Sequence, residues 1–123
     1  MDKKILIVDD DPQITTTLGK LLTGTGALVE SVATKAAAKD SLKRQVPDVA
    51  IIDVLLPDGS GLDLIKEASL LEPKPFFVVL TNSMNAENMA EAMAAKVPMF
   101  IQKADNDPRE IVEMIQTRLA KQV

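Results

Sequence analysis

Five short apolar runs alternate with five amphipathic segments along the chain. The runs lie close to residues 4–8, 27–32, 49–54, 76–80 and 99–102. In the segments between and after them, apolar residues recur every three or four positions, which is typical of a helix that packs one face on a core. Strands separated by helices of this length predict right-handed crossovers and a parallel sheet with helices on both faces. We therefore expect one doubly wound α/β domain, a (βα)5 three-layer sandwich, over residues 1–123.

Capping signals mark the starts of several expected helices. Asp11 stands directly before a proline, as does Asp107, and both arrangements predict an N-cap followed by the first helical residue. Ser60 with Asp63 resembles a capping box at the start of the third helix. Met89 and Met93 lie four residues apart in the helix expected at about 86–96, and we expect them to fill gaps beneath it.

The residue types that are missing restrict the chemistry. The chain has no cysteine, which excludes disulfides and thiolate metal sites, and no histidine, which excludes an imidazole as base, metal ligand or phosphoryl carrier. Its net charge of −4 argues against a nucleic-acid-binding surface. No segment approaches membrane-spanning length, so we expect a cytoplasmic protein.

Polar residues stand where four of the expected strands end. The carboxyl ends of parallel strands meet at one edge of the sheet, where α/β proteins bind ligands. We therefore expect three carboxylates, a hydroxyl and an ammonium to converge, from Asp9, Asp10, Asp53, Thr81 and Lys103.

Clustered carboxylates need a cation, because without one they repel and take up protons. Oxygen ligands without histidine or cysteine suit Mg²⁺, which keeps waters that a phosphate can replace. Lys103 and Thr81 can each bind a phosphate oxygen. Attack by Asp53 would form an aspartyl phosphate, so the set predicts a phosphoryl-acceptor site.

The pattern Ile-Val-Asp9-Asp10, Ile-Ile-Asp53, Val-Leu-Thr81 and Phe100-Ile-Gln-Lys103 resembles the receiver domain of bacterial two-component response regulators. The resemblance covers essentially the whole chain, with the motif positions in order. It implies a flavodoxin-like strand order of 2-1-3-4-5, as in chemotaxis regulators.

The resemblance also implies roles for the site residues. Asp53 is then the phosphoacceptor, and Mg²⁺ is held by Asp10, Asp53 and the backbone carbonyl of Leu55, with Asp9 acting through a water. Thr81 and Lys103 contact the phosphoryl group, and Phe100 is the switching aromatic. Such a domain is a phosphoacceptor with limited self-catalysed phosphorylation and dephosphorylation, and not a turnover enzyme.

The implied partners follow from the same family. The donor is a phosphohistidine on a sensor histidine kinase or a histidine phosphotransfer protein, and the recipient of the signal is a downstream protein or output domain. The switching surface is formed by the fourth helix, fifth strand and fifth helix, which is also a candidate homodimer interface. Direct binding to nucleic acid or membrane is not expected.

Three positions depart from the usual pattern of that family. Ala104 stands where a proline with a cis peptide is common, Asn82 where a small residue is usual, and Leu55 where many relatives carry a polar side chain. We expect Asn82 to narrow access to the site. Our hypothesis is that Leu55 and Asn82 leave the attacking water poorly oriented and make the phosphoryl group long-lived.

Two other functions fit parts of the pattern. A Mg²⁺-dependent phosphohydrolase would use Asp9 or Asp11 as nucleophile in an Asp-x-Asp arrangement, although 123 residues leave no room for the cap domain that such enzymes usually need. A receiver-like binding module without phosphorylation is the third reading.

Overall fold

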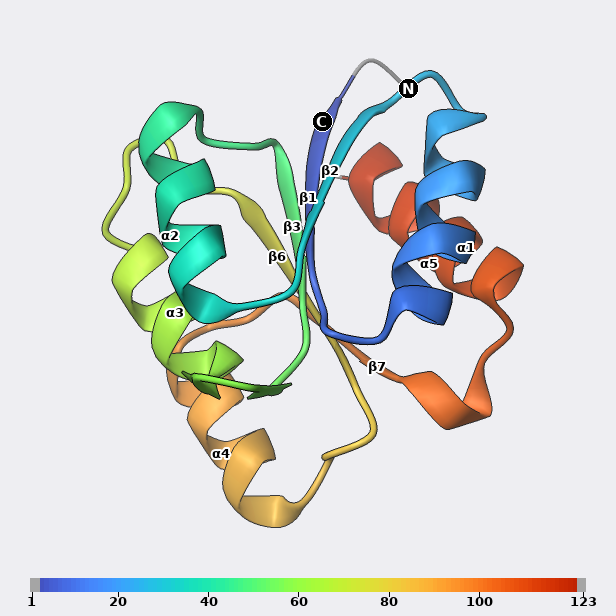
Figure 1. Ribbon diagram of the computed structural model, residues 1–123. Helices are drawn as coiled ribbons and strands as arrows, with labels where there is room; N and C mark the ends of the chain where they lie inside the picture. The colour runs from blue at the N-terminus through green and yellow to red at the C-terminus, as the bar shows by residue number, and fades with distance from the viewer. Residues whose placement is uncertain (1–2, 122–123) are drawn as a thin grey trace.

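A five-stranded parallel sheet forms the centre of the computed structural model, which describes residues 3–121 (Figure 1). Its strand order is β2-β1-β3-β6-β7, which is 2-1-3-4-5 when only these five strands are counted along the chain. This confirms the predicted order. The strands are β1 (Lys4–Val8), β2 (Leu28–Val32), β3 (Val49–Ile52), β6 (Phe76–Thr81) and β7 (Met99–Gln102).

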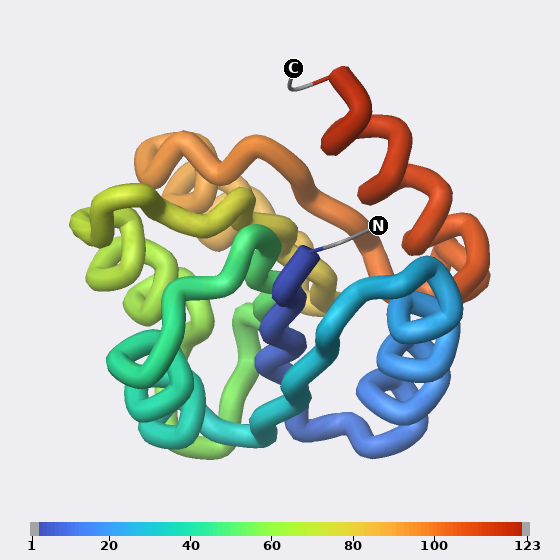
Figure 2. The backbone as a smooth tube through the Cα atoms, turned by 90° about the horizontal axis from the view of Figure 1, so that it is seen from above, coloured from blue at the N-terminus to red at the C-terminus, as the bar shows by residue number. Residues whose placement is uncertain are grey.

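Helices cover both faces of the sheet, which confirms the three-layer architecture. Two helices, α1 (Pro12–Thr23) and α5 (Pro108–Ala120), pack together on one face. The opposite face carries α2 (Lys35–Arg44), α3 (Gly61–Ala68) and α4 (Ala86–Ala94). Figure 2 shows the two helical layers separated by the edge-on sheet.

The central strand β3 is buried along its whole length, as its uninterrupted apolar run predicts. Alternate residues of a strand point to opposite faces, so Ala50 and Ile52 join the core beneath α2–α4 while Val49 and Ile51 join the core beneath α1 and α5. The strand ends at Ile52, two residues earlier than predicted, and Asp53 is the first residue beyond it.

The helix caps at Asp11 and Asp107 are confirmed. Asp11 accepts a hydrogen bond from the Gln13 amide, and Asp107 forms a capping box with Glu110. The predicted capping box at the start of α3 is wrong in its second half. Ser60 is the N-cap and accepts from the Leu62 amide, but Asp63 turns outward, where its Oδ2 lies 3.9 Å from Lys35 Nζ.

Two short elements lie in segments expected to be loops. A two-stranded antiparallel hairpin, β4 (Leu55–Leu56) and β5 (Gly59–Ser60), connects β3 to α3, and the 3-10 helix η1 (Lys103–Asp105) follows β7. Helix α4 ends at Ala94 rather than Lys96. Met93 is 67% exposed, so the expectation that it fills a gap beneath α4 is wrong. None of the helices within residues 3–121 has the length and apolar character needed to cross a membrane.

Candidate functional site

Three aspartates meet where β1 and β3 end. Asp9 directly follows β1 and Asp53 directly follows β3, and the two strands pair in parallel. One carboxylate oxygen from each of Asp9, Asp10 and Asp53 lies within 4.8 Å of the other two. Asp9 and Asp53 are buried, whereas Asp10 is exposed. The topology thus brings together the three carboxylates predicted from the strand ends.

Lys103 places its ammonium between the two buried carboxylates. Its Nζ lies 2.7 Å from Asp9 Oδ2 and 2.8 Å from Asp53 Oδ2, and only 9% of its side chain is exposed. Lys103 is the first residue of η1, so the turn after β7 aims it back across the sheet edge. In this arrangement the lysine supplies the positive charge that two buried carboxylates require.

The electrostatics of the cluster follow from burial and pairing. Burial raises the pKa of Asp9 above its usual range, even though hydrogen bonds from Lys103 and from the Asp11 amide oppose the shift. Burial by itself lowers the pKa of Lys103, but its hydrogen bonds to Asp53 and Asp9 outweigh that effect, and the pKa is raised. Lys103 therefore stays charged at neutral pH, and it offsets the excess negative charge of the site.

The backbone around Asp53 is held on several sides. Its amide donates to the Val8 carbonyl at 2.9 Å, which continues the pairing of β1 and β3, and the Leu55 amide donates to its Oδ1 at 3.3 Å. Gly61, at the start of α3, donates to the Val54 carbonyl at 2.8 Å. A Cβ at Gly61 would overlap the Asp53 carbonyl oxygen and lie 2.7 Å from Ile52 Cγ2. The start of α3 can approach the end of β3 this closely only because residue 61 has no side chain.

The other predicted site residues lie on or next to β3, β6 and β7. Thr81 is buried at the end of β6, beside β7, and its Oγ1 accepts from the Ser83 amide at 3.1 Å. Asn82 is exposed and its Oδ1 accepts from the Ala104 amide at 2.8 Å, so two of the unusual positions are joined to each other. Leu55 is 63% exposed. Phe100 is partly buried and packs on the core beneath α2–α4.

The donor set fits a hard divalent cation. All three candidate ligands are carboxylates, and Mg²⁺ prefers oxygen ligands at about 2.0–2.1 Å, so two oxygens on one ion lie up to about 4.2 Å apart. The separations of up to 4.8 Å therefore need only small side-chain adjustments. The residues present can hold such an ion.

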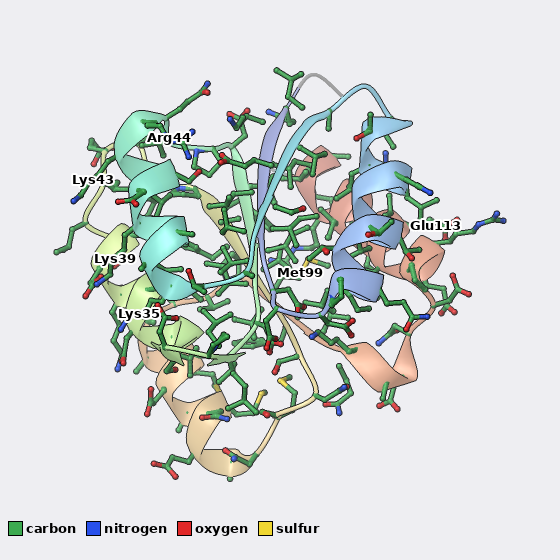
Figure 3. All side chains as sticks on the ribbon, viewed as in Figure 1. Lys35, Lys39, Lys43, Arg44, Met99 and Glu113 are labelled. Carbon is green, nitrogen blue, oxygen red and sulfur yellow. The ribbon has the colours of Figure 1, made fainter. Side chains whose placement is uncertain are left out.

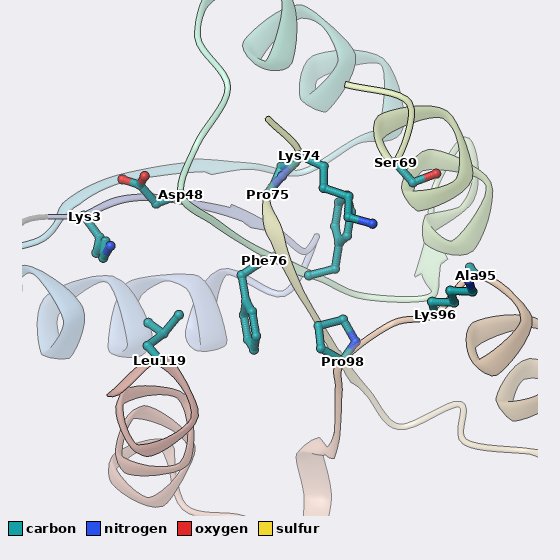
Figure 4. Close-up of a pocket in the computed structure, with 11 residues that line it drawn as sticks. Lys3, Asp48, Ser69, Lys74, Pro75, Phe76, Ala95, Lys96, Pro98 and Leu119 are labelled. Atoms are coloured by element: carbon teal, nitrogen blue, oxygen red, sulfur yellow. The ribbon is translucent and has the colours of Figure 1, made fainter. Parts of the chain in front are cut away.

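A hollow of about 600 Å³ lies at the opposite end of the sheet, where the strands begin (Figure 4). Its lining includes Phe76, Pro98 and Leu119, with Lys74 and Lys96 at its margin. It contains none of the aspartates described above. We therefore take the carboxylate cluster, rather than the larger hollow, as the candidate functional site.

Comparison with known proteins identifies the family of this chain. Residues 5–116 match the family model of the response regulator receiver domain. The chain is 30% identical over 116 residues to the chemotaxis protein CheY of Thermotoga maritima, covering 94% of this chain and 96% of that protein. The structure of a CheY-like receiver domain protein from Methanospirillum hungatei superposes with a TM-score of 0.91 at 30% identity, covering 99% and 97% of the two chains. The chain belongs to the response regulator receiver domain family.

Other relatives are longer. The chain is 26% identical to the regulatory protein VanRc of Enterococcus gallinarum, and the match covers 98% of this chain but 52% of that protein. The match to the DNA-binding response regulator MtrA of Mycolicibacterium smegmatis also covers 52% of the relative. The chain thus spans about half the length of these regulators.

Two residues with structural contacts near the site were not predicted from the sequence. Gly61 allows the start of α3 to approach the Asp53 backbone closely. The sequence did contain a signal for this contact, because Gly59 and Gly61 lie within three residues of a loop, and such glycines often mark a close approach of backbones. Asp58 binds the amides of Lys35 and Ala36, and no local pattern predicts a contact across more than 20 residues.

Proposed function

We propose that the chain is a phosphorylation-activated switch in which Asp53 accepts a phosphoryl group. The supporting observation is the buried Asp53 carboxylate, 7% exposed, with Lys103 Nζ 2.8 Å from one of its oxygens and two further aspartates beside it. Phosphoryl transfer depends mainly on positioning and charge neutralisation, and the Lys103 ammonium supplies a positive charge next to this carboxylate.

The transfer step balances with a phosphohistidine donor. An Asp53 carboxylate oxygen forms the new bond to phosphorus while the bond between phosphorus and the donor imidazole nitrogen breaks, and the electron pair of that bond stays on the imidazole. Lys103 moves from Asp53 to an oxygen of the arriving phosphoryl group, and the Thr81 hydroxyl donates to another. The chain has no histidine, so the donor belongs to a partner, a sensor histidine kinase or a histidine phosphotransfer protein.

Mg²⁺ is the proposed cofactor, and when bound it neutralises the charge that the phosphoryl group brings among the carboxylates. Asp10, Asp53 and the backbone carbonyl of Leu55 would hold it directly, and Asp9 would act through a water. The Asp9 carboxylate accepts from the Asp11 amide through Oδ1 and pairs with Lys103 through Oδ2.

The proposed output is the surface formed by α4, β7 and α5. Phosphorylation draws Thr81 and Lys103 toward new anionic oxygens, and both residues border β7, which carries Phe100. We expect an inactive and an active conformation of this surface in equilibrium. Phosphorylation shifts that equilibrium only by the free energy with which the phosphoryl group favours the active conformation. The exposed Met93 on α4 gives this surface an adaptable apolar contact for a downstream protein, an output domain or a second copy. We place the domain, residues 1–123, in the cytoplasm with its kinase.

The phosphohydrolase alternative has less support from the geometry. An Asp-x-Asp site needs Asp9 and Asp11 side by side, but the Asp11 carboxylate caps α1 through the Gln13 amide at 3.0 Å. Within residues 3–121, the carboxylates close enough to share a cation are those of Asp9, Asp10 and Asp53. Any self-catalysed chemistry is therefore limited to uptake and loss of the phosphoryl group on the chain itself.

Incubation with Mg²⁺ and acetyl phosphate, read by intact mass, tests this proposal. We expect an adduct of one phosphoryl group in the parent protein, none in Asp53→Asn, and none when the metal is removed with a chelator. Absence of the adduct in the parent, or an undiminished adduct in Asp53→Asn, would overturn the proposal. Steady hydrolysis of a small phosphomonoester that survives Asp53→Asn but not Asp9→Asn would support the hydrolase instead.

A further inference from the structure

Asp58 connects the loop after the acceptor strand to a helix that lies far away in sequence. It stands at the tip of the hairpin of β4 and β5, in which Leu55 pairs with Ser60 and Leu56 with Gly59. Its Oδ1 accepts from the Lys35 amide at 2.7 Å and its Oδ2 from the Ala36 amide at 3.0 Å. Both oxygens of this carboxylate therefore bind the start of α2.

These bonds complete the cap of α2. The first amides of a helix have no partner within the helix, and here the first two donate to Asp58 while the third, of Ala37, donates to Thr34 Oγ1 at 3.0 Å. The two amide hydrogen bonds lower the pKa of Asp58, so the carboxylate stays charged at neutral pH, facing the positive end of the helix dipole. One helix terminus is thus capped jointly by its own Thr34 and by a residue of the hairpin.

The Lys35 side chain holds the hairpin from the other side. A Cβ at Gly59 would lie 3.3 Å from Lys35 Cδ and 3.4 Å from its Nζ, so the lysine stem passes directly over this glycine. Gly59 also has a φ of +146°, which side-chain-bearing residues rarely adopt. The Lys35 side chain continues toward Asp63 of α3, and Figure 3 shows Lys35 at the first turn of α2. The hairpin is held between α2 and α3.

The hairpin begins with the residue that borders the acceptor. Leu55 donates its amide to Asp53 Oδ1 and offers its carbonyl as the proposed metal ligand. Its side chain is 63% exposed and so contributes little packing that would hold it in place. The position of the Leu55 backbone depends on the rest of the hairpin, whose other end is tied to α2 by Asp58.

We propose that Asp58 is a positioning residue, whose two bonds to the start of α2 hold the hairpin so that the Leu55 carbonyl faces the aspartate cluster. This rests on the proposed function, because it assigns Asp58 to the same metal and phosphoryl site. Coupling of this kind is reciprocal. The factor by which the Asp58 contact strengthens metal binding equals the factor by which bound metal strengthens the contact between Asp58 and the start of α2.

A pair of alanine variants tests the role. Asp58→Ala removes the two bonds that reach α2 from the hairpin, whereas the matched control Thr34→Ala removes a bond at the same helix terminus without touching the hairpin. Two quantities are measured in each: the Mg²⁺ dissociation constant by calorimetry, and amide hydrogen exchange in residues 35–37 and 55–60 with and without Mg²⁺.

We expect Asp58→Ala to weaken Mg²⁺ binding by about tenfold, the lower end of what residues supporting a metal ligand contribute. In the metal-free variant the hairpin amides should exchange faster. Thr34→Ala should speed exchange at Ala37 and lower the melting temperature, but leave Mg²⁺ affinity and the hairpin amides unchanged. Asp58→Asn, which keeps one acceptor oxygen, should lie between the parent and Asp58→Ala.

Equal Mg²⁺ affinity and equal hairpin exchange in Asp58→Ala and Thr34→Ala would overturn the positioning role. Failure of the proposed function is seen separately, as a parent protein that binds no Mg²⁺ and takes up no phosphoryl group. In that case the metal-free exchange experiment still decides whether Asp58 orders the hairpin.

Discussion

Replacement of Gly61 by alanine perturbs the proposed acceptor, Asp53, without removing any functional group. The new Cβ would overlap the Asp53 carbonyl oxygen, lie 2.9 Å from the carbonyl carbon and lie 2.7 Å from Ile52 Cγ2. Two of these three atoms belong to backbone, and Ile52 is only 1% exposed, so none can turn away into solvent. The start of α3 and the Asp53 peptide must therefore move apart.

The cost has two parts. Forcing an extra methyl into a filled site costs typically about 1–3 kcal/mol of stability. The Gly61 amide also donates to Val54 at 2.8 Å, and a shift of α3 weakens this bond and moves Asp53 relative to Lys103. A displacement on the order of 1 Å at a reacting group can lower a rate by about 100-fold. We therefore expect Gly61→Ala to lose about 1–3 kcal/mol of unfolding free energy and to be phosphorylated at least about tenfold more slowly.

Urea unfolding and the initial rate of uptake from acetyl phosphate measure the two effects. Gly19→Ala is the matched control, because Gly19 lies within α1 and a Cβ there meets no atom within 4 Å. The same substitution should stabilise that helix by about 0.5–1 kcal/mol and leave the uptake rate unchanged. If Gly61→Ala were as stable as the parent and phosphorylated equally fast, the close approach of α3 to Asp53 would play no part in positioning the acceptor.

Three further changes test other parts of the molecule. Lys103→Met leaves Asp9 and Asp53 without their shared cation, so we expect the unfolding free energy of the metal-free protein to fall by about 3 kcal/mol. Mg²⁺ should bind more tightly, because the ammonium no longer competes for the same oxygens. Weaker Mg²⁺ binding in calorimetry would contradict this. Hydrogen bonds from Ser41 and Arg44 lower the pKa of Glu30 below its ordinary value of 4.5, so its contribution is present above pH 4.5 and is lost as the pH falls through the lowered pKa. Urea titrations from pH 6 to pH 3 should give a flatter stability curve for Glu30→Gln than for the parent, and identical slopes would refute the assignment. Leu55→Asn should shorten the lifetime of the phosphorylated protein several-fold by orienting the attacking water, and a lifetime equal to that of the parent in a chase experiment would argue against the role of Leu55.

The sequence was most informative where the chain repeats one simple unit. Some features depend only on interactions within a few residues or on burial of a whole strand. They are the buried run ending at Ile52, the prolines after Asp11 and Asp107, and the apolar spacing of the helices. These local signals determine the alternation of strands and helices. The alternation, with right-handed crossovers, then brings Asp9, Asp53 and Lys103 to one edge of the sheet.

Contacts between distant segments could not be predicted in the same way. Asp63 follows a serine in the spacing of a capping box, but Lys35 from α2 offers it an opposite charge across the helix interface. Met93 has helical spacing with Met89, yet α4 buries only its Ala92, so a methionine on the outer side stays exposed. The tie between Asp58 and α2 depends on where the hairpin lies relative to a helix more than 20 residues earlier. Each of these depends on how two elements pack and not on a pattern within one.

Chemical trapping of the phosphorylated residue tests the central claim most directly. Borohydride reduces an aspartyl phosphate to homoserine, so the parent protein, loaded with acetyl phosphate and Mg²⁺, can be reduced, digested and mapped by peptide mass. We predict homoserine at position 53 and at no other aspartate. Homoserine at Asp9, Asp10 or Asp11, or its absence from the whole chain, would contradict the assignment of Asp53 as the phosphoacceptor.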